Sequence, residues 1–154
     1  MKTLTTTTSY QADNPKWIGS KTGRDAMITG TLDRSAFFAA THYPNGFFLS
    51  GILLGKITAT GLYGPLDTDL SNGQEVFAGI LGEPVEDSGS DDGDLIVPIQ
   101  WLGLVIAAQL PVTAEAANGG GIPAAIAYAE GPPQINAATG IEQLVSQIPT
   151  IRFR

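Results

Sequence analysis

No cysteine occurs in the chain, and histidine occurs once, at His42. The absence of cysteine excludes thiolate nucleophiles, disulfide bonds and thiolate metal sites. A single imidazole cannot form a histidine cluster for zinc or iron, and a Ser/His/Asp triad would depend on His42 alone. Because no G-x-S-x-G sequence surrounds any serine, we interpret His42 as a turn histidine. We expect no catalytic residue, no metal site and no cofactor.

Charged residues are also scarce, at 15% of the chain, and no long hydrophobic run is present. The longest apolar stretch, residues 95–111, is broken by glutamine, glycine and proline and is shorter than the roughly 20 residues that cross a bilayer. The N-terminus lacks the apolar region of a secretory signal, so we expect the mature protein to begin at Met1. With 43% hydrophobic residues, the 154-residue chain is long enough for one domain with a core.

The few charges are unevenly distributed. Residues 1–56 carry six Lys or Arg and three Asp, which gives a net charge of +3. Residues 57–151 carry twelve acidic residues and no Lys or Arg, a net charge of −12, and Arg152 and Arg154 follow. A body this acidic repels phosphates and anionic lipids, so we expect neither a nucleic acid nor a membrane as a partner.

Residues 1–26 are predicted to form an extended N-terminal arm. Five of the first eight residues are Thr, which favours extended backbone, and Pro15 and several glycines disfavour a helix. The segment has too few apolar side chains to form a core of its own. Trp17 therefore lacks an internal partner, and we predict that it anchors on another subunit.

Residues 27–154 are predicted to form a single, mainly β domain, because the 19 glycines and 10 prolines of the chain are typical of short strands joined by turns. Phe77 and Trp101 fall in predicted strands and are expected in the core. Pro98 is expected at an edge or at a position that makes no hydrogen bond, and Gly103 at a bulge. Strands are expected at residues 27–33, 52–59, 76–81 and 95–101, and a tight turn at Tyr43–Gly46.

The C-terminal part is predicted to contain a flexible loop and one or two short helices. Asn118 to Gly121 is the loop, because glycine runs have little conformational restriction. Pro123 suits the first position of a helix over residues 124–129. Four apolar residues at helical spacing within residues 141–148 predict a second helix that packs on the sheet.

Three motif-like segments are interpreted as ordinary loops. Residues 83–94 have the acid density of a calcium loop, but Asp92 stands where an EF-hand needs glycine, so we predict a solvated acidic turn and leave ion binding by Asp87 to Asp94 open. Residues 119–124 fit the G-x-G-x-x-A pattern of dinucleotide-binding loops, but no buried strand precedes them, so we do not predict a dinucleotide site there. Residues 19–23 contain phosphate-loop residue types in the wrong order.

The order of several short segments resembles that of the head decoration proteins of tailed bacteriophages, of the lambda type. Each segment is short and rich in glycine, so the order carries the resemblance, which covers roughly residues 26–154. The segments are GILLGKITATGLYGPLD at 51–67, Asn72-Gly73, VFAGIL at 76–81, DLIVP at 94–98 and IPTIRFR at 148–154.

The resemblance implies a capsid cement protein with a small barrel or sandwich of the β-clip or β-tulip type. Such a protein binds the major capsid protein on the outer capsid surface of the virion, and it is located in the host cytoplasm during assembly. It forms homotrimers at local three-fold positions of the expanded shell and stabilises the shell against internal DNA pressure, without catalysis. The longer segment before residue 50 and the stretch 117–133 depart from short family members, so trimer contacts cannot be carried over.

The resemblance also implies that the N-terminal arm contacts the capsid by adding backbone pairing to its strands, which suits a Thr-rich segment. On this interpretation, removal of residues 1–17 leaves a folded domain that no longer binds capsids. The expected capsid-binding residues are Leu4, Thr5, Thr6, Thr7, Thr8, Tyr10 and Trp17.

Two alternatives remain from the sequence. One is a carbohydrate- or receptor-binding β module of the virion tail, because small β domains serve that role. The other is an enzyme that uses carboxylate pairs such as Glu83 with Glu86 or Asp67 with Asp69, although sequence spacing does not place two carboxylates together in space.

Overall fold

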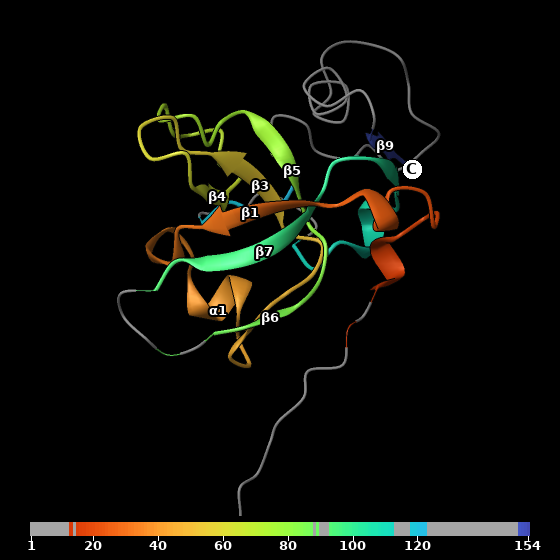
Figure 1. Cartoon of the computed structure of the whole chain (residues 1–154), viewed down its shortest axis with the longest axis horizontal. Helices are drawn as coiled ribbons and strands as arrows, with labels where there is room; N and C mark the ends of the chain where they lie inside the picture. The colour runs from red at the N-terminus through yellow and green to blue at the C-terminus, as the bar shows by residue number, and fades with distance from the viewer. Residues whose placement is uncertain (1–12, 14, 88, 90–92, 113–117, 123–150) are drawn as a thin grey trace, which may run out of the picture.

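The computed structural model describes residues 13, 15–87, 89, 93–112, 118–122 and 151–154 (Figure 1). Its main feature is a small closed barrel with strand order β1-β4-β3-β5-β7. Neighbouring strands are antiparallel except β1 and β4, which run parallel and meet only at Leu32 and Tyr63. The predicted mainly β fold is therefore confirmed. The barrel strands are β1 (Ile28–Leu32), β3 (Leu53–Lys56), β4 (Tyr63–Pro65), β5 (Phe77–Leu81) and β7 (Leu95–Gln100).

Two short sheets and five short helical segments complete the described chain. The 3-10 helices are η1 (Pro15–Trp17), η2 (Arg24–Ala26), η3 (Arg34–Ala36) and η4 (Ala107–Gln109), and α1 spans Ala39–His42. β2 (Phe47–Phe48) pairs with β6 (Val85–Glu86), and β8 (Gly103–Val105) pairs in parallel with β9 (Ile151–Phe153). None of the described helices is long and apolar enough to cross a membrane.

The core lies on both faces of β3. Leu54 belongs to one hydrophobic cluster with Leu32 and Ile99, whereas Leu53 belongs to another with Trp17 and the C-terminal β9. Because successive side chains of a strand point to opposite faces, the unbroken run of leucines fits a strand that is buried on both sides. β1 and β7 form the longest ladder, with five consecutive pairs from Ile28 opposite Ile99 to Leu32 opposite Leu95.

The four predicted strands and the predicted turn are all present, with shorter strands than expected. The Gly46 N–H donates to the Tyr43 carbonyl at 3.0 Å, and Gly46 has a φ of 78°, which suits glycine. Pro98 lies in an inner strand, and its carbonyl accepts from the Gly82 N–H at 2.9 Å. This bond continues the pairing of β5 with β7 by one residue, so Pro98 lies neither at an edge nor at a position without a hydrogen bond, and that prediction is wrong.

Two further predictions for the strand after residue 95 are wrong. Trp101 is 37% exposed, because the barrel strand ends at Gln100 and Trp101 lies beyond it. Gly103 makes no bulge within one strand; with a φ of 134° it begins β8, which belongs to a different sheet. Phe77 is buried as predicted.

The predicted arm is too long, and the prediction for Trp17 is wrong. Trp17 is completely buried in the core of its own chain, so its ring is not available to another subunit. From Pro15 onward the chain belongs to the folded body, and the removal of residues 1–17 considered above would delete part of the core. Residues Leu4 to Tyr10 lie outside the described residues, as do the helices predicted at 124–129 and 141–148.

The prediction of a flexible loop at Asn118 to Gly121 is also wrong. Gly119, Gly120 and Gly121 are buried. The Leu53 N–H donates to the Gly120 carbonyl at 2.9 Å, and the Gly120 N–H donates to the Leu66 carbonyl at 2.8 Å. A side chain at Gly119 would lie 2.6 Å from the Leu66 carbonyl oxygen, so glycine allows close packing here.

Candidate interaction surface

Both ends of the described chain are fixed around β8. On one side, the Gly19 N–H donates to the Leu104 carbonyl at 2.8 Å, and the Ile106 N–H donates to the Trp17 carbonyl at 2.7 Å. On the other side, β9 runs parallel to β8, and the Arg154 N–H donates to the Val105 carbonyl at 2.7 Å. Figure 1 shows these segments beside one another at one end of the molecule. We call this region, residues 15–26, 101–110 and 151–154, the terminal end.

Trp17 anchors the N-terminal segment to the barrel. Its indole Nε1 donates to the Ser50 hydroxyl at 3.2 Å, and that hydroxyl donates to Asp13 Oδ1 at 2.5 Å. Gly51 has a φ of 95°, and a side chain there would lie 2.9 Å from the Trp17 ring. The sequence therefore places residues 1–12 directly before an anchored segment at the terminal end.

Positive charge collects at the terminal end. Lys16, Lys21 and Arg154 are exposed there, and Arg24 is half-buried in η2, against one exposed acid of the same segment, Asp25. The exposed acids of the barrel and its loops lie on other elements: Asp69, Glu83, Glu86 and Asp94. The charge asymmetry along the sequence is thus also an asymmetry in space, with a cationic end and an acidic barrel.

Two exposed apolar side chains, Trp101 and Ile28, adjoin the terminal end. The Trp101 Nε1 donates to the Ala26 carbonyl at 2.6 Å, which holds the exposed indole beside η2. Ile28 is 44% exposed at the start of β1. Ile96 in β7 is 74% exposed opposite Thr31, on the other face of the β1–β7 ladder from Ile28, so it is not part of this region. Exposed apolar side chains next to cations are typical of protein interfaces. We define the terminal surface as Lys16, Lys21, Arg24, Arg154, Ile28 and Trp101.

His42, interpreted from the sequence as a turn histidine, is a buried residue at the end of α1. Its Nδ1 accepts from the Phe38 N–H at 2.9 Å, so Nδ1 carries no proton, and Nε2–H donates to the Gly119 carbonyl at 3.1 Å. Burial lowers the pKa of His42 below its usual value, which favours the neutral ring. His42 therefore joins α1 to the buried glycine segment.

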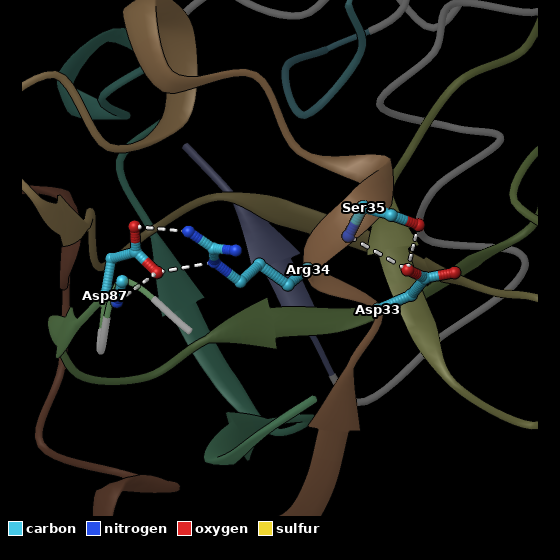
Figure 2. A network of polar contacts seen from close by, with 5 residues as sticks. Asp33, Arg34, Ser35 and Asp87 are labelled. Atoms are coloured by element: carbon cyan, nitrogen blue, oxygen red, sulfur yellow. Dashed lines mark hydrogen bonds and ion pairs between the residues drawn. The ribbon is translucent and has the colours of Figure 1, made fainter. Parts of the chain in front are cut away.

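The first aspartate of the predicted acidic turn, Asp87, is bound by an arginine. Arg34 Nε lies 2.6 Å from Asp87 Oδ1 and Nη2 lies 3.0 Å from Oδ2, a two-point contact between η3 and the residue after β6 (Figure 2). The hydrogen bond from Arg34 lowers the pKa of Asp87. Asp33 Oδ1 caps η3 by accepting from the Ser35 N–H at 3.0 Å.

No metal-binding group of three or more His, Asp or Glu side chains occurs within the described part of the chain. Asp91 and Asp92 lie outside the described residues. Asp87 itself is engaged by a guanidinium, which competes with a cation for the same oxygens.

The sequence interpretation missed the terminal surface because its parts come from distant segments. The charge count located the cations of the N-terminal third, and alternation in IRFR is the pattern of a strand, but neither predicts that β9 lies beside residues 15–26. No protein-family model, curated protein or solved structure matches the chain.

Proposed function

We propose that the protein is a structural, non-enzymatic capsid decoration protein. It binds the major capsid protein on the outer surface of the expanded head of a tailed bacteriophage, as homotrimers at local three-fold positions, and stabilises the shell against internal DNA pressure. The observation that carries the proposal is the terminal surface, where the anchored segment of residues 15–26, the cations and Trp101 meet at one end.

The charge distribution supports this mode of binding. A molecule with a cationic end and an acidic barrel approaches an acidic partner with its terminal end first and keeps its barrel in solvent. Trp and Arg are enriched among the residues that contribute most to protein interfaces, and Trp101 and Arg24 supply both here.

The position of the anchored segment supports a role for residues 1–12. Trp17 fixes the chain to the barrel, so a Thr-rich stretch that precedes it starts from the face proposed to meet the capsid. Extended segments add to exposed strand edges of a partner through main-chain hydrogen bonds. In the proposal, residues 1–12 contribute affinity and the terminal surface sets orientation.

The test is binding to purified heads that lack the protein. A chain without residues 2–12 retains Asp13 and Trp17 and is expected to fold but to lose capsid binding. Lys16→Glu with Lys21→Glu is expected to weaken binding about tenfold, with the largest effect at low salt. Lys56→Glu, the matched reversal of an exposed cation on the barrel, is expected to leave binding unchanged. The proposal would be overturned if the chain without residues 2–12 and the variant with Lys16→Glu and Lys21→Glu both bound heads as tightly as the wild-type protein.

A further inference from the structure

The side chain of Asn72 is held in one orientation by its neighbour Gln74. Asn72 Oδ1 accepts from the Gln74 N–H at 3.0 Å, and Asn72 Nδ2 donates to Gln74 Oε1 at 2.9 Å. Gln74 is 4% exposed, and its Nε2 donates to the Pro65 carbonyl at 3.0 Å. Because a carbonyl can only accept, the Pro65 contact fixes which way the Gln74 amide faces, and this in turn fixes the Asn72 amide.

The backbone nitrogen that follows Asn72 faces a carboxylate. The Gly73 N–H donates to Glu75 Oε2 at 2.7 Å. Gly73 has a φ of 109° and no side chain to cover its nitrogen, and the neighbouring Lys56 carbonyl leaves no space for one. Glu75 therefore accepts the proton that must leave before this nitrogen can act as a nucleophile.

These contacts match the requirements of one reaction, attack of the Gly73 nitrogen on Cγ of Asn72. In that reaction negative charge develops on Asn72 Oδ1, where the Gln74 N–H already donates. The leaving amide nitrogen is held by Gln74 Oε1. A base, Glu75, and an oxyanion donor, the Gln74 N–H, are thus held beside the Asn72-Gly73 dipeptide, which reduces the entropic part of the barrier.

We propose that Asn72-Gly73 is a self-modifying site that closes to a succinimide. The Gly73 nitrogen forms a bond to Asn72 Cγ and loses its proton to Glu75, the bond from Cγ to Nδ2 breaks, and ammonia leaves with that proton. Water then opens the ring at either carbonyl, which leaves aspartate or isoaspartate at position 72. The reaction consumes one water, releases one ammonia and needs no oxidant or cofactor. It does not depend on capsid binding.

The chain contains two further Asn-Gly pairs that serve as internal references. Asn45-Gly46 is exposed, but the Gly46 N–H donates to the Tyr43 carbonyl, which is not a base. Asn118-Gly119 is packed inward, and Asn118 Nδ2 donates to the Thr41 hydroxyl at 3.0 Å. The three pairs share the same intrinsic dipeptide chemistry, so differences between them report the folded surroundings.

Peptide mass spectrometry of the full-length protein after incubation at neutral pH in ¹⁸O-labelled water measures the conversion of each asparagine. In the folded protein, Asn72 is expected to convert about tenfold faster than Asn45. In urea the three sites are expected to convert at similar rates, because the contacts of Glu75 and Gln74 are lost. Slower conversion of Asn72 in the folded chain than in urea would show that the fold protects this amide and would overturn the proposal.

Glu75→Gln retains an accepting oxygen but removes the base, so it is expected to reduce the rate at Asn72 to that of Asn45. Glu83→Gln removes an exposed acid elsewhere and is expected to change nothing. An unchanged Asn72 rate in folded Glu75→Gln would contradict the assigned role of Glu75. If that variant does not fold, the comparison of folded and urea-unfolded wild-type protein still decides the proposal.

Discussion

The indole nitrogen of Trp17 donates a hydrogen bond to the hydroxyl of Ser50, 33 residues further along the chain, at 3.2 Å. This contact joins the N-terminal segment to the strand-rich body and buries the Trp17 ring completely. The folded domain therefore includes Trp17. Residues 1–12, which are proposed to bind the capsid, precede this anchored segment in the sequence.

Trp17→Ala is expected to lower the free energy of unfolding by about 3 to 5 kcal/mol, because it leaves a cavity in the core and removes the hydrogen bond that the indole donates to Ser50. Trp101→Ala is the matched control. It is expected to cost about 1 kcal/mol, because Trp101 is partly exposed and donates one hydrogen bond to Ala26. Urea unfolding measures both, and equal losses would contradict the assignment of Trp17 to the core and Trp101 to the surface.

The stability of the protein is expected to decrease as the pH falls below about 6.5, the usual pKa of histidine. Burial lowers the pKa of His42, so the unfolded chain binds a proton that the folded chain resists. The free energy of unfolding then falls by up to about 1.4 kcal/mol per pH unit, until the pH reaches the folded-state pKa. Because His42 is the only histidine, His42→Gln is expected to remove this slope. A slope between pH 5 and 7 that persists in folded His42→Gln would contradict the prediction.

Arg34→Ala is expected to lower the free energy of unfolding by about 1 to 2 kcal/mol at neutral pH, because it removes a two-point contact with Asp87. The pKa of Asp87 is lowered in the folded protein, so the contribution is complete above the usual aspartate value and is lost as the pH falls below it. Asp94→Asn, at an exposed position, is the control. Thermal unfolding at pH 7 and pH 3 tests this, and an equal effect of Arg34→Ala at both would argue against the ion pair.

Gly119→Ala is expected to lower the free energy of unfolding by about 3 kcal/mol or more. The added Cβ meets the Leu66 carbonyl, and a φ of 73° strains any side chain. Gly46→Ala shares the positive φ, 78°, but meets no atom within 4 Å, so it is expected to cost only about 1 kcal/mol. The difference between the free energies of unfolding of the two variants measures how tightly the glycine segment is packed. Similar losses of stability in both variants would indicate that backbone strain, and not close packing, accounts for the effect at Gly119.

Local patterns predicted the local structure. Alternation and β-branched residues located the strands, and Pro44, Asn45 and Gly46 located the turn, because those signals act over a few residues. The same reasoning placed Trp101 in the core, since it follows a hydrophobic run, although the strand ends one residue earlier.

Long-range contacts could not be predicted from local sequence. A tryptophan in a polar segment and a run of three glycines both suggest exposed, loosely held chain. Trp17 is buried because Ser50 and β8 lie beside it, and the glycines are buried because His42, 77 residues from Gly119, supplies a hydrogen bond. The terminal surface has the same origin, because β8 brings residues 15–26 and 151–154 together.

The most direct test of the proposed function is gradient sedimentation of an infected-cell lysate, with this protein and the major capsid protein quantified by mass spectrometry in each fraction. A decoration protein is expected to sediment with full heads in amounts close to those of the major capsid protein. A few copies per particle would indicate a tail or fibre module instead, and absence from all particle fractions would contradict a structural role in the virion.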